Sequence, residues 1–429
     1  MNVHDSERMA GLLKQAGYEI TEEATDADLV VVNTCSVRER AEDKLYSRLG
    51  VLSGGDSANR PLIAVTGCVA QQEANNIFRR SGHVDVVVGT QAIRHLPMLV
   101  DAAERTSAPQ MDVNPYDDVS FPLGLASRND PVKAFVTVIE GCNDFCSFCV
   151  VPYTRGHERM RPAADIIREV ERAAEEGHRE IQLLGQIVNH YEAPDVPGCD
   201  FAGLLAQVND VRGVERIRFA SPHPRHVTAE MIRAMAELPK VCNHLHLPVQ
   251  SGSTSVLTAM RRRYTREEYL ELVGNIRDAI PALALSTDVI VGFPGETDAQ
   301  FEETLSLVSE VGYQSMFSFK YSERPKTLAA NRLPDDVDEK EKSRRLTELQ
   351  LLQNGIQARL LAEAVGSTQE VLVDSTSRRR AHEVSGRTSR NTVVNFAGSS
   401  EWIGRTMNVR ILRAGPHSLW GKAEVSHAD

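Results

Sequence analysis

Between residues 134 and 320 the chain alternates six times between a short strand-like segment and a helix-like segment. The strand-like segments occupy residues 134–139, 181–184, 216–219, 244–247, 285–291 and 315–320, and helical patterns between them lie, for example, at 163–176, 228–238, 265–279 and 299–311. Short strands that alternate with helices are typical of a parallel sheet. Six such repeats predict an α/β fold with a partial (β/α)6 barrel, whose chemistry would gather at the carboxyl ends of the strands.

Three cysteines follow the first of these strands. Cys142, Cys146 and Cys149 lie within the eight-residue segment CNDFCSFC. In a reduced protein, closely spaced cysteines are more often metal ligands than disulfide partners. A structural zinc ion would require a fourth ligand, usually from a second paired arm, and no such arm follows in the sequence. Three thiolates on a [4Fe–4S] cluster, in contrast, leave one iron open to a ligand of another kind.

The composition excludes several other classes of protein. Apolar residues make up 41% of the chain, which is enough to bury real cores. Seven cysteines in 429 residues are too sparse for a disulfide-stapled scaffold, and no apolar run reaches the ~18 residues of a membrane span. A net charge of −11 argues against a uniformly basic nucleic-acid coat. We therefore expect a reduced, cytoplasmic, multidomain protein with no membrane contact.

The first 108 residues repeat a strand–turn–helix pattern. Apolar runs at 28–33, 62–66 and 84–88 each end in a turn, which predicts a flavodoxin-like domain with a parallel sheet. Cys35 and Cys68 follow two of these runs at equivalent places, where parallel sheets carry their sites. Their position alone does not decide whether these two cysteines are metal ligands or inert buried thiols.

The remaining sequence divides into a linker at 109–131, the barrel at 132–334, a connecting helix at 335–364 and a β-rich module at 365–425. The last module predicts a small β-barrel. Five arginines gather in it, either on a solvated loop or against a phosphate backbone: Arg378, Arg379, Arg380, Arg387 and Arg390.

Several longer motifs resemble one known family. They are EGCNDFCSFCVVPYTRG (140–156), LLGQIVN (183–189), HLPVQSG (246–252), DVIVGFPGET (288–297), FSFKYSERPKT (317–327) and GRTSRNTVVNF (386–396). Their order is similar to that of the methylthiotransferases among the radical S-adenosylmethionine (SAM) enzymes. The resemblance covers nearly the whole chain, and its last domain resembles a TRAM-type RNA-binding module.

The resemblance implies two [4Fe–4S] clusters. Cys142, Cys146 and Cys149 would hold the cluster that binds and cleaves SAM, while Cys35 and Cys68 would hold an auxiliary cluster that delivers sulfur. A 5′-deoxyadenosyl radical would remove hydrogen from C2 of a modified adenosine 3′ of a tRNA anticodon, and a second SAM would supply the methyl group. The implied partners are an electron donor protein and the tRNA anticodon stem-loop. We expect a monomer, since nothing in the sequence demands a larger assembly.

Other residues at strand ends are candidates for lining the SAM site. The resemblance places Gly185, Gln186, Gln250, Gly292 and Pro294 there, although glycine and proline end strands in any case. The three arginines at 261–263 could bind a cofactor carboxylate or a tRNA phosphate, or could lie at a solvated helix end. Cys199 and Cys242 match no family ligand. We expect Cys199 to be a surface thiol and Cys242 to be a core thiol.

One departure from the family concerns the start of the sequence. The family pattern has three auxiliary cysteines, the first in a turn written Gly-Cys-Gln-Met-Asn, and this sequence begins at Met-Asn. We expect Met1 to be internal to the native protein, which would begin about a strand-length upstream.

The substrate is the second open point. The motifs favour N6-isopentenyladenosine in tRNA. The alternatives are threonylcarbamoyladenosine in tRNA, an aspartate of a ribosomal protein, or a catalytically impaired tRNA-binding homologue.

Overall fold

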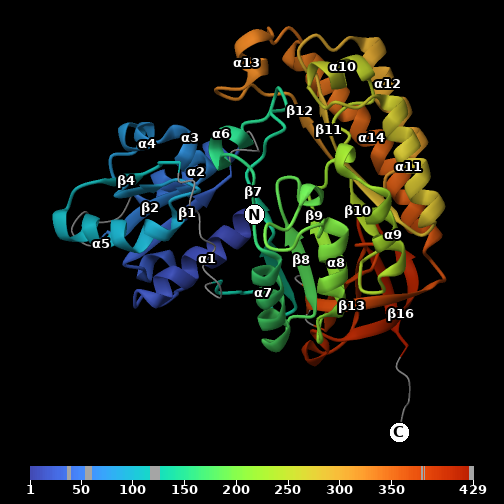
Figure 1. The fold of residues 1–429 in the computed structure, drawn as a ribbon, viewed down its shortest axis with the longest axis horizontal. Coiled ribbons are helices and arrows are strands. Elements are labelled where there is room, and N and C mark those ends of the chain that lie inside the picture. The colour runs from blue at the N-terminus through green and yellow to red at the C-terminus, as the bar shows by residue number, and fades with distance from the viewer. Residues whose placement is uncertain (36–39, 54–59, 116–125, 378–379, 381, 425–429) are drawn as a thin grey trace.

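The computed structural model describes residues 1–35, 40–53, 60–115, 126–377, 380 and 382–424. An N-terminal α/β domain, a central barrel of strands and helices, and a C-terminal β-barrel lie next to one another (Figure 1). The two outer domains contact different ends of the central barrel.

The N-terminal domain is built on a parallel sheet of order β1-β2-β3-β4. Its strands are β1 (Leu29–Thr34), β2 (Leu62–Gly67), β3 (Val86–Val88) and β4 (Gln110–Asp112), and its helices are α1 (Asn2–Gln15), α2 (Arg40–Leu52), α3 (Cys68–Glu73), α4 (Asn75–Arg80) and α5 (Leu96–Thr106). Valine and isoleucine dominate β2 and β3, whose two faces pack into separate apolar cores. The parallel-sheet prediction is confirmed. Strand β4 lies within the predicted linker, because Gln-Met-Asp carries no apolar run.

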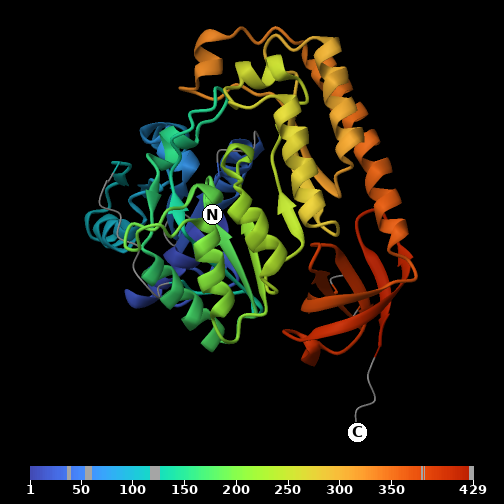
Figure 2. The same cartoon turned by 45° about the vertical axis from the view of Figure 1, so that its right-hand side comes forward.

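The central barrel contains the six predicted parallel strands in two sheets. These are β5 (Lys133–Thr137), β8 (Glu180–Leu184) and β9 (Arg216–Ala220), then β10 (His244–His246), β11 (Ala284–Val291) and β12 (Ser315–Lys320). A parallel bridge between Ile217 and Val241 joins the two sheets. Among the described residues β5 and β12 do not pair, so the barrel is open, as predicted (Figure 2).

Helices surround the barrel strands. They are α6 (Val151–Arg155), α7 (Ala163–Glu175), α8 (Phe201–Asp210), α9 (Ala229–Glu237), α10 (Thr254–Ala259), α11 (Arg266–Ala279), α12 (Asp298–Val311) and α13 (Leu328–Arg332). Thr265 and Thr297 begin α11 and α12 with capping boxes, in which each side chain accepts a backbone N–H of the first turn. A short antiparallel pair, β6 (Ile139–Glu140) and β7 (Arg159–Met160), flanks the cysteine loop. The loop is therefore fixed at both of its ends.

Helix α14 (Glu339–Glu363) leads from the barrel to the C-terminal domain. There, β13 (Thr368–Thr376), β14 (Glu383–Thr388), β15 (Val393–Ala397), β16 (Thr406–Ala414) and β17 (Leu419–Ala423) close into a barrel of order β13-β14-β15-β17-β16. Alternate residues of β14 and β15 are buried, as expected of strands with one face in a core. The predicted small β-barrel is confirmed.

The C-terminal domain contacts the amino ends of the barrel strands. Arg218 of β9 donates from Nη2 to the carbonyl of Thr388 at 2.7 Å and from Nη1 to that of Ser389 at 3.1 Å. Gln314 donates to Thr392 Oγ1 at 2.6 Å. This end of the barrel is opposite the strand ends that carry the cysteine loop.

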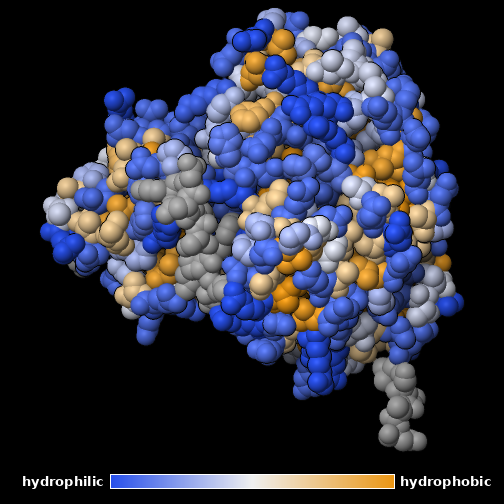
Figure 3. Space-filling model, in the orientation of Figure 1, coloured by the Kyte–Doolittle hydropathy of each residue, from blue (hydrophilic) through white to orange (hydrophobic). Residues whose placement is uncertain are grey.

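Hydrophilic residues dominate the face shown in Figure 3, and its hydrophobic residues form several separate patches. None of the described helices combines the length and the apolar character that a membrane span requires.

Candidate active site

All five cysteines that the sequence singled out line one cavity. Its volume is about 280 Å³, and it lies between the N-terminal sheet and the carboxyl ends of the barrel strands. Its lining comprises Met1, Asn2, Cys35, Cys68, Cys142, Asp144, Cys146, Phe148, Cys149, Val151, Arg155, Gly185, Gln186, Ile187, Ser221, His223, Gln250 and Arg262. The fold therefore brings together side chains more than 200 residues apart in the sequence.

Hydrogen bonds and one glycine hold the Cys142–Cys149 loop. Gly141 has φ of 82°, and a Cβ there would lie 2.0 Å from the carbonyl oxygen of His157, so only glycine fits. Ser147 donates its N–H to Met260 O at 3.0 Å and accepts the N–H of Ala329 at 2.7 Å. The loop is thus anchored to the chain after α10 and to α13, while its three thiols face the cavity.

The thiols of this loop are suited to metal binding. Burial raises the pKa of Cys142 and of Cys149 to about 12, so without a metal these side chains carry no charge. Iron binds the thiolate, and binding would therefore release protons from these thiols. The Cys142–Cys149 loop supplies three thiols to this cavity, which fits a [4Fe–4S] cluster with one iron free of a protein ligand.

Cys35 and Cys68 are brought together by the ends of β1 and β2. Gly67, with φ of 91°, precedes Cys68, and a Cβ there would lie 2.4 Å from the carbonyl oxygen of Thr34. Glycine therefore permits the close approach of the two strand ends. A hydrogen bond with Cys35, supported by the charge of Arg155, lowers the pKa of Cys68 to about 6. Cys68 is thus prepared to bind iron as a thiolate.

Arg155 links the two groups of cysteines. It ends α6, just after the Cys142–Cys149 loop, and its Nη2 lies 2.5 Å from Asp5 Oδ2 on α1. Gln91 of the N-terminal domain donates to the carbonyl of Arg155 at 2.9 Å. This buried ion pair holds a guanidinium beside Cys68 and joins the N-terminal domain to the barrel. The sequence assigned neither Arg155 nor Asp5 to the site. Asp5 was a candidate cap of the first helix, but it lies within the first turn of α1 instead.

Three of the five residues predicted to line the SAM site do line this cavity. Gly185 and Gln186 follow β8, and Gln250 follows β10. The backbone of Gln250 is fixed by β11, because its N–H donates to Asp288 O and its carbonyl accepts the N–H of Ile290, both at 2.9 Å. Its φ of 75° is unusual for a residue other than glycine, and such strain concentrates at functional sites.

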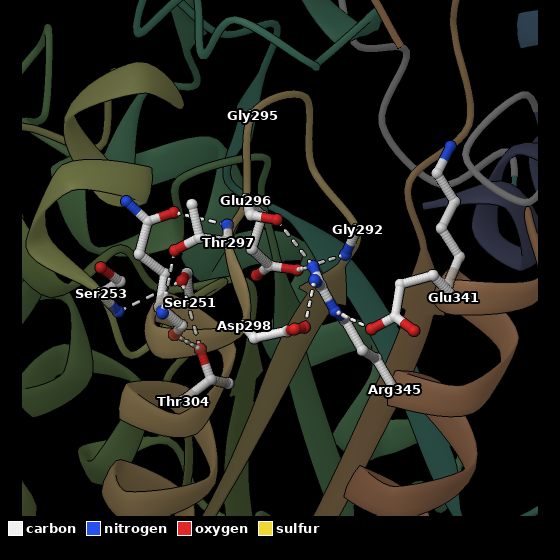
Figure 4. A network of polar contacts seen from close by, with 12 residues as sticks. Ser251, Ser253, Gly292, Gly295, Glu296, Thr297, Asp298, Thr304, Glu341 and Arg345 are labelled. Atoms are coloured by element: carbon white, nitrogen blue, oxygen red, sulfur yellow. Dashed lines mark hydrogen bonds and ion pairs between the residues drawn. The ribbon is translucent and has the colours of Figure 1, made fainter. Parts of the chain in front are cut away.

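Gly292 and Pro294 are not among the described residues that line the cavity. The N–H of Gly292 donates to Glu296 Oε2 at 2.6 Å, and Glu296 pairs with Arg345 of α14 at 3.0 Å (Figure 4). The geometry explains how this loop is held against α14. A cofactor role for Gly292 and Pro294 stays a prediction.

His223, which the sequence reasoning also missed, adds a neutral hydrogen-bond donor to the cavity. Its Nδ1 accepts the N–H of Arg225 at 3.2 Å, so its Nε2 carries the proton and faces Asp144 Oδ2 at 3.4 Å. Burial lowers the pKa of His223 to about 2, which keeps the ring neutral. His226 also lies near Asp144, but His223 in this tautomer offers no lone pair on Nε2 to a metal. We therefore interpret His223 as a donor toward a bound ligand.

The two cysteines outside the predicted site are both buried. Cys242 is a core thiol, as expected. Cys199 was expected at the surface, and that expectation is wrong, because its thiol packs against α8 at Gly203 and Gln207. Gln207 of α8 lies 3.2 Å from its Sγ.

A second cavity, of about 510 Å³, lies between the barrel and the C-terminal domain. Its described lining includes Lys133, Arg218, Arg387 and Arg390 but no carboxylate, although the protein is acidic. Phe317 also lines it with 55% of its surface exposed. Ser221 lines both cavities, so the second cavity leads toward the cysteines.

Only part of the predicted arginine cluster can be placed. Arg387 and Arg390 face the second cavity, and Arg380 pairs with Glu383 at 2.7 Å. Arg378 and Arg379 lie outside the described residues.

Three family patterns match the chain in the order of its domains. Uncharacterized protein family UPF0004 matches residues 1–89, the Radical SAM superfamily matches 136–308, and the TRAM domain matches 362–423. Among solved structures, the radical SAM methyltransferase TsrM from Kitasatospora setae, with tryptophan substrate and a SAM analog bound, is similar with a TM-score of 0.57. At 12% identity, covering 86% of this chain and 76% of that one, the likeness shows the fold alone.

Curated relatives match over almost their whole length. Proteins named tRNA-2-methylthio-N(6)-dimethylallyladenosine synthase are 44% identical in Clostridium botulinum, over 98% of this chain and 94% of theirs. The protein of that name in Geobacter metallireducens is 46% identical over 99% and 96%, and the one in Alkalilimnicola ehrlichii is 45% identical over 98% and 95%. The chain belongs to the tRNA-2-methylthio-N(6)-dimethylallyladenosine synthase family of radical SAM enzymes.

Proposed function

We propose that this protein replaces the C2 hydrogen of N6-dimethylallyladenosine in tRNA by a methylthio group. The observation that carries the proposal is that Cys35 and Cys68 face the same cavity as Cys142, Cys146 and Cys149. A sulfur source and a radical source must both reach one carbon atom, and a shared cavity provides this proximity.

Each group of cysteines has its own role in this proposal. Cys142, Cys146 and Cys149 would hold the cluster that binds SAM, and Cys35 with Cys68 would supply two thiolates of the auxiliary cluster. When bound, the clusters and SAM supply the electron, the radical that takes the C2 hydrogen, the sulfur and the methyl group, chemistry that no side chain provides.

The surrounding residues orient the reactants and exclude water. Gly185, Gln186 and Gln250 would line the SAM site beside the free iron position, with His223 as a hydrogen-bond donor. Arg155 would fix the auxiliary ligands relative to the SAM site, because it is paired with Asp5 of the N-terminal domain. Because the cavity lies between two domains, it would keep the reactive species away from water.

A deletion strain provides the test of this proposal. We expect mass spectrometry of its tRNA nucleosides to show loss of 2-methylthio-N6-dimethylallyladenosine and accumulation of N6-dimethylallyladenosine. The wild-type gene should restore the modified nucleoside, and a gene encoding the Cys146→Ala variant should not. Persistence of the nucleoside, or loss of a threonylcarbamoyl derivative instead, would contradict the proposal.

The cavity between the barrel and the C-terminal domain is the proposed path of the tRNA. Arg218 and Lys133 pair with Glu180 behind this cavity, at 2.8 and 3.5 Å, and Arg387 lies 3.8 Å from Asp374. Arg390 has no such partner in the described chain and suits a phosphate backbone, while the exposed ring of Phe317 suits a base. The TRAM match supports RNA binding by the C-terminal domain, while contact with the anticodon stem-loop belongs to the proposal. An electron donor protein and a monomeric state stay predictions.

Arg390 is the side chain that tests this path best. It is exposed, and no carboxylate of the described chain lies within ion-pair distance of it. We expect Arg390→Ala to weaken binding of an anticodon stem-loop several-fold and to reduce the slope of log K against log salt by about one. Arg168→Ala, which removes an exposed arginine from α7, is the matched control and should change neither quantity. Equal effects of the two variants would show that RNA binding depends only on the net charge of the protein and would contradict the proposed path.

A further inference from the structure

Arg262 is a buried cation beside a predicted cluster ligand. Only 5% of its surface is exposed, and its Nη1 lies 3.5 Å from Cys146 Sγ. Its Nη2 donates to Pro248 O at 3.0 Å, and its Nε donates to the hydroxyl of Tyr264 at 3.0 Å. Three different nitrogens are thus fixed, and the guanidinium cannot turn away from the sulfur.

None of these partners carries a compensating charge. Burial raises the pKa of the Tyr264 phenol, so it stays neutral, and Pro248 offers a carbonyl dipole. Among the described residues, no carboxylate lies within 4 Å of the Arg262 guanidinium. A buried charge without a counter-charge is strongly unfavourable. Its neighbours Arg261 and Arg263 are exposed, so burial is specific to Arg262.

We infer that Arg262 is the built-in counter-ion of the SAM-binding cluster and raises its reduction potential. The inference rests on the proposed role of Cys146 as a cluster ligand. Three thiolates outweigh the charge of the oxidised four-iron core, and one-electron reduction adds a further negative charge. A fixed cation in a low-dielectric site stabilises the more negative, reduced form more than the oxidised one. An N–H donated to a ligand sulfur acts in the same direction.

The test is a redox titration of the reconstituted cluster, followed by electron paramagnetic resonance. At the potential that reduces half of the wild-type cluster, we expect no more than about one tenth of the Arg262→Met cluster to be reduced, a shift of about 59 mV or more for one electron. Arg262→Lys keeps the charge and should shift the midpoint far less. Arg263→Met, at the exposed neighbour, should leave it unchanged.

The apo-protein provides a second readout that a purely structural arginine would not give. Without iron, Arg262→Met removes an uncompensated buried charge, and we expect it to unfold at the same or a higher denaturant concentration than wild type. With the cluster bound, we expect Arg262→Met to unfold at a lower denaturant concentration than wild type.

The two proposals can fail separately. A wild-type protein without a SAM-binding cluster would contradict the proposed function. The inference, but not the proposed function, would be overturned if Arg262→Met bound its full iron content and kept the wild-type midpoint potential. Equal shifts of the midpoint in the Met and Lys variants would overturn it as well. A large loss of apo-protein stability in Arg262→Met would also overturn it.

Discussion

Replacing Cys146 by alanine is expected to remove the SAM-binding cluster and to abolish formation of 5′-deoxyadenosine. Cys146 is the middle thiol of its loop, and Cys142 and Cys149 alone offer the cluster two ligands. Because the cofactor carries the difficult chemistry, no side chain provides a residual path, and activity should fall to the uncatalysed background. Anaerobic reconstitution, iron analysis and chromatography of the SAM products measure each step.

The matched control is Cys199→Ala. Cys199 is another free thiol of the barrel domain, and it is more buried than the half-buried Cys146, but it does not line the cysteine cavity of the described structure. We expect this variant to keep both clusters and wild-type product formation. Full SAM cleavage in Cys146→Ala would contradict the assignment of the loop, and loss of cleavage in both variants would point to a general effect of removing buried thiols.

Replacing Cys68 by alanine should separate SAM cleavage from methylthiolation. Cys68 belongs to the N-terminal domain, and no hydrogen bond joins it to the Cys142–Cys149 loop in the described chain. The SAM-binding cluster should therefore assemble and still produce 5′-deoxyadenosine when tRNA is present. Without the auxiliary cluster there is no sulfur to transfer, so the methylthio nucleoside should be absent.

The ratio of the two products is the measurement for Cys68→Ala. In wild type we expect formation of the methylthio nucleoside to accompany SAM cleavage, whereas in the variant cleavage continues alone. Cys242→Ala serves as a control, since it removes a buried thiol that is not among the described residues lining the cysteine cavity. Methylthiolation by Cys68→Ala at the wild-type level would show that Cys68 has no part in the sulfur transfer.

Much of the fold could be predicted from the sequence, because strands, helices and turns leave patterns in residues that are close together in the chain. The six barrel strands are short segments of strand-forming residues between helical patterns, and Gly67 and Gly141 lie in turns whose backbone conformations exclude other residues. Strand β4 was missed because a three-residue strand at a sheet edge needs only hydrogen bonds to β3 and no apolar pattern.

The parts of the site that could not be predicted depend on tertiary contacts. Arg155 is significant only because α1 places Asp5 against it, 150 residues away in the sequence. Arg262 stands among three consecutive arginines, and only the fold buries the middle one. The tautomer of His223 is set by the N–H of Arg225, which no sequence pattern reveals.

The central claim is that one cavity holds two clusters, and the iron and sulfide content after anaerobic reconstitution tests it most directly. For the wild-type chain we predict about eight iron atoms and eight sulfides, four of each for every [4Fe–4S] cluster. For Cys68→Ala and for Cys146→Ala we predict about four. A wild-type content of about four, unchanged in Cys68→Ala, would show that Cys35 and Cys68 do not by themselves hold a cluster in this chain and would contradict the account.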